Sequence, residues 1–163
     1  MNITDSKMAV VHDWFTDKSF GGAEKVTISI DNFLKEKYST PDIFSVTANI
    51  KKFKKNNFEN RTIKTSFVQS LPFGKTYVQN FLPILPFAIE QIDLSPYDLI
   101  ISSSHAVAKG IITSPNQLHI SYVHTPMRYA WDQMNTYLKQ STISRLGFSI
   151  PIRYILYKLR EWD

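Results

Sequence analysis

The sequence predicts an α/β protein, a Rossmann-like three-layer sandwich with a mainly parallel sheet. Two observations lead to this fold class. Short continuous apolar runs alternate with longer amphipathic segments along the 163 residues, and polar or glycine-bearing stretches follow several of the runs. Continuous apolar runs are typical of strands that helices cover on both faces, as in a parallel sheet. The length fits a single domain, which we assign to residues 1–163.

The first half of the chain is expected to contain two or three strands and one long helix. Residues 7–12 and 42–48 are short apolar runs typical of buried strands, and residues 62–68 can hold a third strand. Residues 22–37 are predicted to form a helix. The apolar stripe of this helix consists of Val26, Ile30, Phe33 and Leu34.

The second half is expected to alternate in the same way. The predicted strands are residues 97–104 and 118–124. A helical segment at 77–94 must break or kink at its two prolines, Pro83 and Pro86. The other helical segments are a short helix or turn ending at Gly110, a helix over 126–138 and a helix over 149–163. In such folds ligands bind at the carboxyl ends of the strands, so residues that follow a strand are the functional candidates.

Composition excludes several classes of protein. The chain has no cysteine, which excludes disulfides and thiolate zinc sites and suits a reducing cytoplasm. No metal-ligand spacing such as HExxH occurs, so we expect no metal site. No apolar run reaches the length of a membrane span, and the first residues lack the pattern of a signal peptide.

The net charge of +5 fits a phosphate-rich ligand, an anionic membrane surface or an ordinary basic surface. The basic residues of segment 51–61 have no nucleic-acid-binding motif around them, and we expect no nucleic-acid partner. The segment over 149–163 continues an apolar face that consists of Leu146, Ile152, Ile155, Leu156 and Leu159. That face can pack on its own domain or lie in a membrane interface.

The pair Gly21-Gly22 lies between the first predicted strand and the first predicted helix. Glycine without a Cβ lets a ligand approach the main chain, and the following helix offers unpaired N–H groups and the positive end of its dipole. Such a junction can bind an anion, typically a phosphate. A tight turn without a ligand explains the residues equally well. The pattern is neither GxGxxG nor GxxxxGK[ST], which disfavours dinucleotide-binding and P-loop proteins.

Polar residues follow the last two predicted strands. His124 ends one strand, and together with Arg128 it can contact a phosphate or a sugar. A histidine that caps a helix or bonds within the core explains the same position. Ser104, His105 and Lys109 follow the other strand and suit either an oxygen-rich ligand or an ordinary surface.

Four segments together are similar to the N-terminal half of a known enzyme family. They read VVHDWFTDKSFGGAEKV, TSFVQSLPF, FLPILPFAIEQIDLSPYDLIISSSHAVAKG and HISYVHTPMRYAWD. Over about residues 7–163 the chain resembles the glycogen-synthase-like (family 4) retaining glycosyltransferases of the GT-B type. The nearest branch is the bacterial mannosyltransferase-like enzymes, which build O-antigen and other surface polysaccharides.

The resemblance implies roles for particular residues. In this family the glycine-rich loop lies against the diphosphate of the donor, which assigns that contact to Gly21 and Gly22. The family's histidine after the late strand contacts the transferred sugar or the phosphates, and His124 occupies that place. The residues implied on the acceptor side are His12, Asp13, Trp14, Ser104, His105, Lys109 and Arg128.

The resemblance also implies a reaction that this chain shares with a second domain. A GT-B enzyme has two Rossmann-like domains, and this chain corresponds to the N-terminal, acceptor-side one, so the donor-binding C-terminal domain is expected to be absent. The implied reaction transfers a sugar, with mannose as a candidate, from GDP-mannose or a UDP-sugar to a lipid-linked or saccharide acceptor. It needs no metal or other cofactor, because the nucleotide sugar is a substrate.

The implied location is the cytoplasm or the inner face of the plasma membrane, where an anionic membrane surface is a further candidate partner. We expect the isolated chain to be inactive. Two other functions stay open. One is a non-catalytic module of the same fold that binds a sugar or a partner chain. The other is an unrelated Rossmann-like nucleotide-binding protein, which the missing GxGxxG pattern disfavours.

Overall fold

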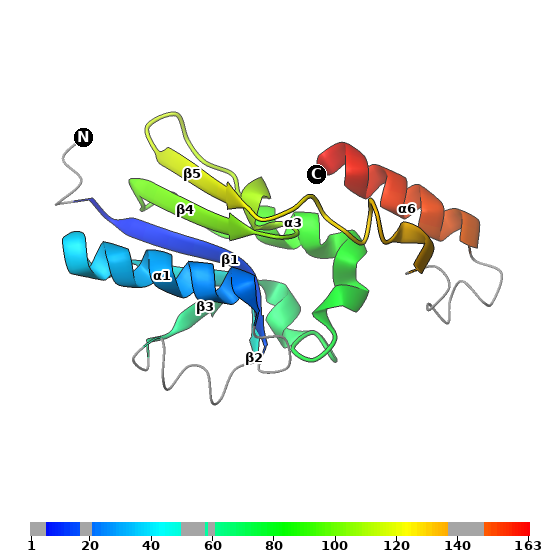
Figure 1. Ribbon diagram of the computed structural model, residues 1–163, viewed down its shortest axis with the longest axis horizontal. Coiled ribbons are helices and arrows are strands. Elements are labelled where there is room, and N and C mark those ends of the chain that lie inside the picture. The colour runs from blue at the N-terminus through cyan, green and yellow to red at the C-terminus, as the bar shows by residue number, and fades with distance from the viewer. Residues whose placement is uncertain (1–5, 17–20, 50–57, 59–60, 137–148) are drawn as a thin grey trace.

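The computed structural model describes residues 6–16, 21–49, 58, 61–136 and 149–163. Five parallel strands form one sheet in the order β3-β2-β1-β4-β5. The strands are β1 (Met8–Thr16), β2 (Asp42–Asn49), β3 (Ile63–Thr65), β4 (Leu99–Ser104) and β5 (Leu118–Val123). The predicted α/β fold with a parallel sheet is confirmed, and Figure 1 shows the strands with their carboxyl ends at one edge.

Helices cover both faces of this sheet (Figure 1). Helix α1 (Gly22–Lys37) lies on one face. The opposite face is covered by two 3-10 helices and a short α-helix, namely η2 (Phe67–Ser70), η3 (Val78–Ile84) and α3 (Leu85–Glu90). A third 3-10 helix, η4 (Ala108–Gly110), follows β4. Helix α6 (Ser149–Trp162) lies beyond the carboxyl ends of the strands.

The central strand β1 divides the core into two parts. Its side chains Ala9 and Val11 belong to the larger cluster, which packs against α3 and α6. Val10, between them, belongs to a smaller cluster beneath α1. Successive side chains of a strand point to opposite faces, so one apolar run serves both layers.

The buried face of α1 is largely polar, which corrects part of the predicted apolar stripe: Leu34 is buried and Ile30 packs against the smaller core cluster, but polar residues fill most of the face. Apart from Leu34, its buried residues are Glu24, Thr27 and Asp31, whereas Phe33 is 53% exposed. These polar groups are tolerated because each has a specific partner. Asp31, for example, pairs with the guanidinium of Arg61, and burying a charge requires such a partner.

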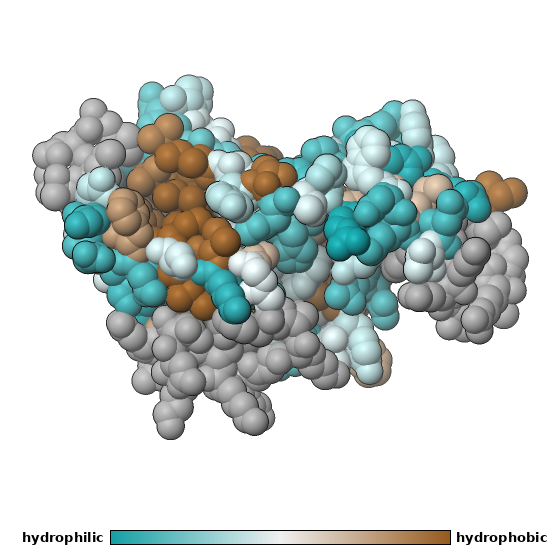
Figure 2. Space-filling view, viewed as in Figure 1, coloured by the Kyte–Doolittle hydropathy of each residue, from teal (hydrophilic) through white to brown (hydrophobic). Residues whose placement is uncertain are grey.

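Strand β5 forms one edge of the sheet, and most of its side chains are exposed. Leu118, Ile120 and Tyr122 are each between 43% and 51% exposed. They continue the face on which Leu99 and Ile101 of β4 pack beside α1. Figure 2 shows apolar side chains gathered over β4, β5 and the adjoining side of α1.

Two predicted helices differ in their outcome. The segment 77–94 breaks as expected, because η3 contains Pro83 and α3 begins directly after η3 with a proline in its first turn. The helix over 126–138 is wrong for residues 126–133, which form bends and turns, and right for residues 134–136. Tertiary contacts explain the difference, since the N–H of Met127 bonds to Asp163 and the carbonyl of Ala130 accepts from Arg160. Residues 137 and 138 lie outside the described part.

The predicted tail helix is confirmed, and it packs on its own domain. Leu156 and Leu159 are buried, and Ile152 and Ile155 pack partly buried against the larger core cluster. Leu146 and most of the basic segment 51–61 lie outside the described residues. Among the helices that the structure describes, none combines the length and apolar character that a membrane crossing requires.

Candidate functional site

A pocket of about 550 Å³ opens at the carboxyl edge of the sheet. It is lined by α1, by the turn after β4 and by the segment after β5, through Gly22, Ala23, Val26, His105, His124, Thr125, Arg128, Tyr129 and Gln133. Four predicted site residues therefore meet here, namely Gly22, His105, His124 and Arg128. The parallel sheet explains the meeting, because it brings the loops after its strands to one edge.

Helix α1 begins at this pocket, with Gly21 as its N-cap. The N–H of Gly21 donates to Glu24 Oε2 over 2.8 Å, but Gly21 has no side chain that could cap the first-turn amides in return. A Cβ added at Gly22 would meet no atom of the described residues within 4 Å. The first N–H groups of a helix have no partner within the helix, and Gly22 and Ala23 of this first turn line the pocket.

A tight turn does not explain the two glycines. The φ angle of Gly21 is −129°, which any residue can adopt. A Cβ at Gly21 would lie 3.5 Å from the nearest atom, Glu24 Oε2, which is ordinary van der Waals contact. Neither backbone conformation nor packing within the domain therefore requires glycine at these positions.

Asp13 of β1 is completely buried and organises the turn after β4. Its carboxylate accepts hydrogen bonds from the main-chain N–H groups of four successive residues, 105–108. His105 Nδ1 lies 2.9 Å from the same carboxylate. Burial by itself would raise the pKa of Asp13, but the charge of His105 and the hydrogen bonds from it hold that pKa well below its usual range. Asp13 is therefore an anion at neutral pH.

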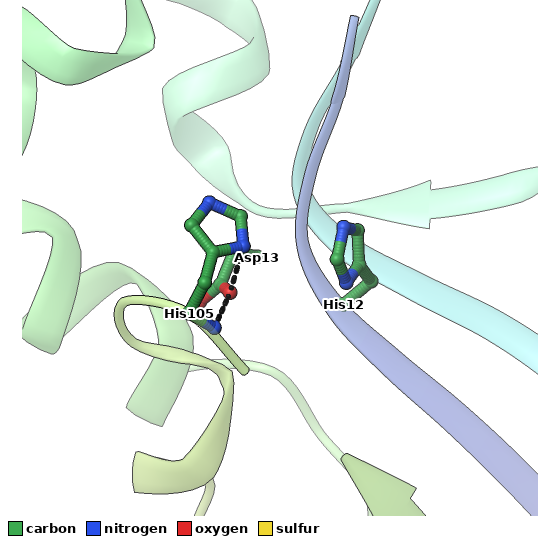
Figure 3. Close-up of side chains that lie close together, drawn as sticks. All are labelled: His12, Asp13 and His105. Atoms are coloured by element: carbon green, nitrogen blue, oxygen red, sulfur yellow. Dashed lines mark hydrogen bonds and ion pairs between the residues drawn. The ribbon is translucent and has the colours of Figure 1, made fainter. Parts of the chain in front are cut away.

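His105 faces Asp13 with one nitrogen of its ring, and the other nitrogen points away (Figure 3). Its Nδ1 lies 2.9 Å from Asp13 Oδ2, and attraction between the two charges contributes more to this contact than the hydrogen bond does. The ring also stands edge-on to Trp14, with centroids 4.7 Å apart. Burial lowers the pKa of His105, but the neighbouring Asp13 raises it more, and the net shift is upward. His105 therefore carries a proton more often than an ordinary histidine.

A hydrogen-bonded network connects His124 in the pocket with the buried His12. Ser103 Oγ lies 2.9 Å from His124 Nε2 and 2.9 Å from Thr27 Oγ1. Thr27 Oγ1 in turn lies 3.1 Å from His12 Nδ1. Burial lowers the pKa of both histidines, so both are neutral at neutral pH.

The network also determines which nitrogen of His12 is protonated. His12 Nδ1 lies 2.8 Å from the main-chain oxygen of Ser103. A carbonyl oxygen only accepts, so we assign the proton to Nδ1. The other nitrogen, Nε2, is then unprotonated and can only accept a hydrogen bond. It is buried without a hydrogen-bond partner among the described residues.

His12, Asp13 and His105 also bring possible metal-ligand atoms within 4.8 Å of one another. The donor set fits a metal poorly. A carboxylate has about four lone-pair positions, and the four amides already use those of Asp13. A metal on Asp13 would have to displace the bonds that hold the turn after β4. Metal-independent chemistry stays a prediction.

Several predicted acceptor-side residues do not line the pocket. The side chains of His12, Asp13, Trp14 and Ser104 are at most 2% exposed, because β1 is the central strand and β4 is its neighbour. They can act on a bound molecule only through their neighbours. Lys109 is also withdrawn from the pocket, since its Nζ pairs with Asp163 Oδ1 at 2.7 Å. An acceptor-side role for these residues stays a prediction.

Sequence reasoning missed Thr27 and Ser103, which connect the two histidines. A signal was present in α1, where Glu24, Thr27 and Asp31 recur at helical spacing and so share one face. Polar residues on one face usually mark the solvent side of a helix, and only the three-dimensional structure shows that this face is buried.

Comparison with family models, with curated proteins and with solved structures finds no match for this chain. Its function is therefore inferred from the residues of the site.

Proposed function

We propose that this chain is the N-terminal, acceptor-side domain of a retaining GT-B glycosyltransferase. The observation that carries the proposal is the convergence of Gly22 and His124 on one pocket at the carboxyl edge of the sheet. These are the residues to which the family resemblance assigns the donor diphosphate and the transferred sugar. Glycines that the fold itself does not require support a close approach of a ligand to the main chain.

In this proposal the first-turn amides of α1 face the diphosphate of GDP-mannose or a UDP-sugar. The negative charge on the diphosphate grows as the sugar leaves, and fixed amide dipoles stabilise that charge without reorganising. His124 contacts the transferred sugar, held in orientation by its bond to Ser103. The reaction needs no cofactor in this scheme.

A lipid-linked or saccharide acceptor is the proposed second substrate. Exposed aromatic side chains on η2, on the turn between η2 and η3 and on α3 support a lipid surface, and they are Phe67, Phe73, Tyr77 and Phe87. Phe73 is 73% exposed with a φ of 63°, a conformation that is unusual for a bulky residue. Aromatic rings are favoured at membrane interfaces, so we place the protein in the cytoplasm, peripheral to the inner face of the plasma membrane.

The isolated domain is expected to be inactive. Holding donor and acceptor in line contributes up to about 7–11 kcal/mol in reactions of this kind, and one domain supplies only part of the site. In the open pocket, water also hydrates the amides and weakens their electrostatic effect.

The test is radiolabel transfer from GDP-mannose and UDP-glucose with this chain co-expressed with a nucleotide-sugar-binding domain encoded beside it. We expect transfer by the pair and none by the chain alone. Calorimetric titration of the chain alone should show weak or undetectable nucleotide-sugar binding. Micromolar binding or transfer by the chain alone, or no transfer by the pair, would contradict the proposal.

A substitution in the pocket sharpens this test. Gly22→Val should abolish transfer with little change in stability, because its side chain would project into open space where the donor approaches. Ser29→Val is the matched control, since Ser29 is exposed on the same helix and does not line the pocket. Equal transfer by both variants would refute the diphosphate contact at Gly22.

A second candidate function is a non-catalytic module of the same fold that binds a sugar or a partner chain. The exposed apolar face of β5 favours it, because exposed apolar patches often mark interaction surfaces. Persistent absence of transfer, together with stable binding of a saccharide, would support this alternative.

A further inference from the structure

We propose that the Asp13–His105 pair is a fixed cation for the pocket, and that the pocket's ligand carries a phosphate or diphosphate group bound at Nε2 of His105. The inference rests on the proposed function, which supplies two phosphate-bearing molecules, the donor and a lipid-linked acceptor. It assigns the binding of the phosphate group that both molecules carry to Asp13 and His105, for which the family resemblance implied only a position on the acceptor side.

The pair is built as a buried anion beneath a half-exposed cation. Asp13 is 0% exposed, while the side chain of His105 is 25% exposed and lines the pocket. Because Nδ1 faces Asp13, the opposite nitrogen of the ring points away from Asp13 (Figure 3), and His105 lines the pocket. The edge of Trp14 packs against the ring and limits its movement. This is the arrangement in which a buried carboxylate orients a histidine toward a substrate.

Asp13 does not cancel the charge of His105 completely. Four amide dipoles already stabilise the carboxylate, so its negative charge is shared between those amides and the imidazolium. The pocket therefore keeps a positive character at His105. Arg128 lines the same pocket, and its guanidinium is only loosely paired, 3.4 Å from Asp132.

The other charged and titratable groups around His105 come from three elements. His12 of β1 has its ring centroid 5.6 Å from that of His105, and His124 follows β5. Burial lowers the pKa of both, so neither adds a competing positive charge. Glu24 of α1 is buried and bonded to Gly21, and its negative charge helps raise the pKa of His105.

With these surroundings, the affinity for a phosphate group should decrease as the pH rises. The imidazolium is present below the pKa of His105, which lies above its ordinary value, and is lost as the pH rises through it. Affinity for a phosphate group should fall over that range. By linkage, a bound phosphate should raise the pKa of His105 further.

The experiment is an NMR titration of the 163-residue chain with inorganic pyrophosphate at several pH values from about 6 upward, in which the ring signals of His105 themselves report the pH at which it loses its proton. We expect the ring signals of His105 to move on binding and the affinity to be weaker at the higher pH values. His105→Gln should weaken binding by about tenfold or more, the usual loss for a charge-assisted hydrogen bond. His119→Gln is the control, because His119 on β5 bonds to Ser102 and does not line the pocket.

Two further ligands test whether the bound phosphate belongs to the donor or to the acceptor. GDP represents the donor and geranyl diphosphate represents a lipid-linked acceptor, and the tighter of the two identifies the molecule that His105 meets. Equal pyrophosphate affinity in His105→Gln and in the unchanged protein, or unmoved His105 signals at saturation, would overturn the inference. Sugar transfer by the co-expressed pair together with those results would leave the proposed function intact, whereas pyrophosphate binding at His105 without transfer by the pair would overturn only the proposed function.

Discussion

Strands β1 and β5 lie in the same parallel sheet and have similar apolar sequences, but their burial is opposite. Every residue of β1 from Met8 to Phe15 is buried, including two charged or titratable ones. In β5 no side chain is fully buried. β1 is the central strand between β2 and β4, whereas β5 has a neighbour on one side only.

The comparison teaches that the two strands contribute to the pocket in different ways. β1 supplies buried groups, His12 and Asp13, that act through hydrogen bonds on the residues of the pocket wall. β5 delivers His124 directly into the pocket at its carboxyl end. Substitutions in β1 should therefore affect the whole domain, and equivalent changes in β5 should affect it little.

The largest expected effect is at Asp13. Asp13→Ala should destabilise the domain by about 3–5 kcal/mol, since it removes a buried acceptor and leaves four amides without a partner. Urea unfolding followed by circular dichroism measures the loss. Ser121→Ala in β5 is the control and should change stability by less than about 0.5 kcal/mol. A loss at Asp13 no larger than the control's would break the contrast between the strands.

A matched pair of valines tests packing alone. Val11 of β1 is 0% exposed and Val123 of β5 is 47% exposed. Val11→Ala should cost about 1.5–3 kcal/mol through lost burial and the cavity it leaves, and Val123→Ala about 0.5 kcal/mol or less. Both values come from the same denaturant experiment. Similar losses at the two positions would mean that β5 is covered in solution.

A pair of histidines tests the pH dependence of stability. Burial lowers the pKa of both His12 in β1 and His119 in β5. A folded-state pKa below the ordinary 6.5 means that the unfolded chain binds more protons, so stability is present above pH 6.5 and is lost as the pH falls below it.

We expect His12→Gln to remove more of this acid sensitivity than His119→Gln, because His12 is completely buried and His119 is not. The measurement is the midpoint of thermal unfolding at several pH values below neutral. His105 changes in the opposite sense, since its raised pKa adds stability that is complete below pH 6.5 and lost as the pH rises. His105 also helps to lower the pKa of His12, so the two variants are compared well below pH 6.5, where His105 is protonated in both the folded and the unfolded chain.

The smallest expected effect on stability is at Ile120, which is 49% exposed on the open face of β5. Ile120→Thr keeps a β-branched side chain suited to a strand and should change unfolding by less than about 0.5 kcal/mol. Its effect should instead appear as reduced self-association in concentration-dependent light scattering, because an exposed apolar edge strand promotes contacts between molecules. An unfolding change like that of Val11→Ala would contradict the exposure of β5.

The sequence allowed the strands, α1 and α6 to be located because their patterns are local. The runs at 7–12 and 97–104, for example, are apolar whether or not their neighbours are known. The buried polar face of α1 could not be recognised, because it depends on partners from distant segments. Thr27 forms hydrogen bonds with His12 and Ser103. Asp31 pairs with Arg61.

For the candidate site, too, some features could be predicted from the sequence and others could not. The positions of Gly22 and His124 after their strands were enough to predict that they meet, because a parallel sheet gathers its loops. The burial of Asp13 and the pairing of Lys109 with Asp163 depend on contacts between distant segments. No spacing in the sequence encodes those contacts.

The carboxylate of Asp163, next to the end of α6, has a mechanical consequence for the pocket. It accepts from the indole of Trp131 and from the main-chain N–H of Met127, and the pocket-lining Arg128 and Tyr129 lie between those two residues. Through Asp163, the end of helix α6 is therefore bonded to the residues on both sides of this wall of the pocket. We expect a displacement of this helix to change the shape of that wall, and amide hydrogen exchange at residues 127–131 would measure the change.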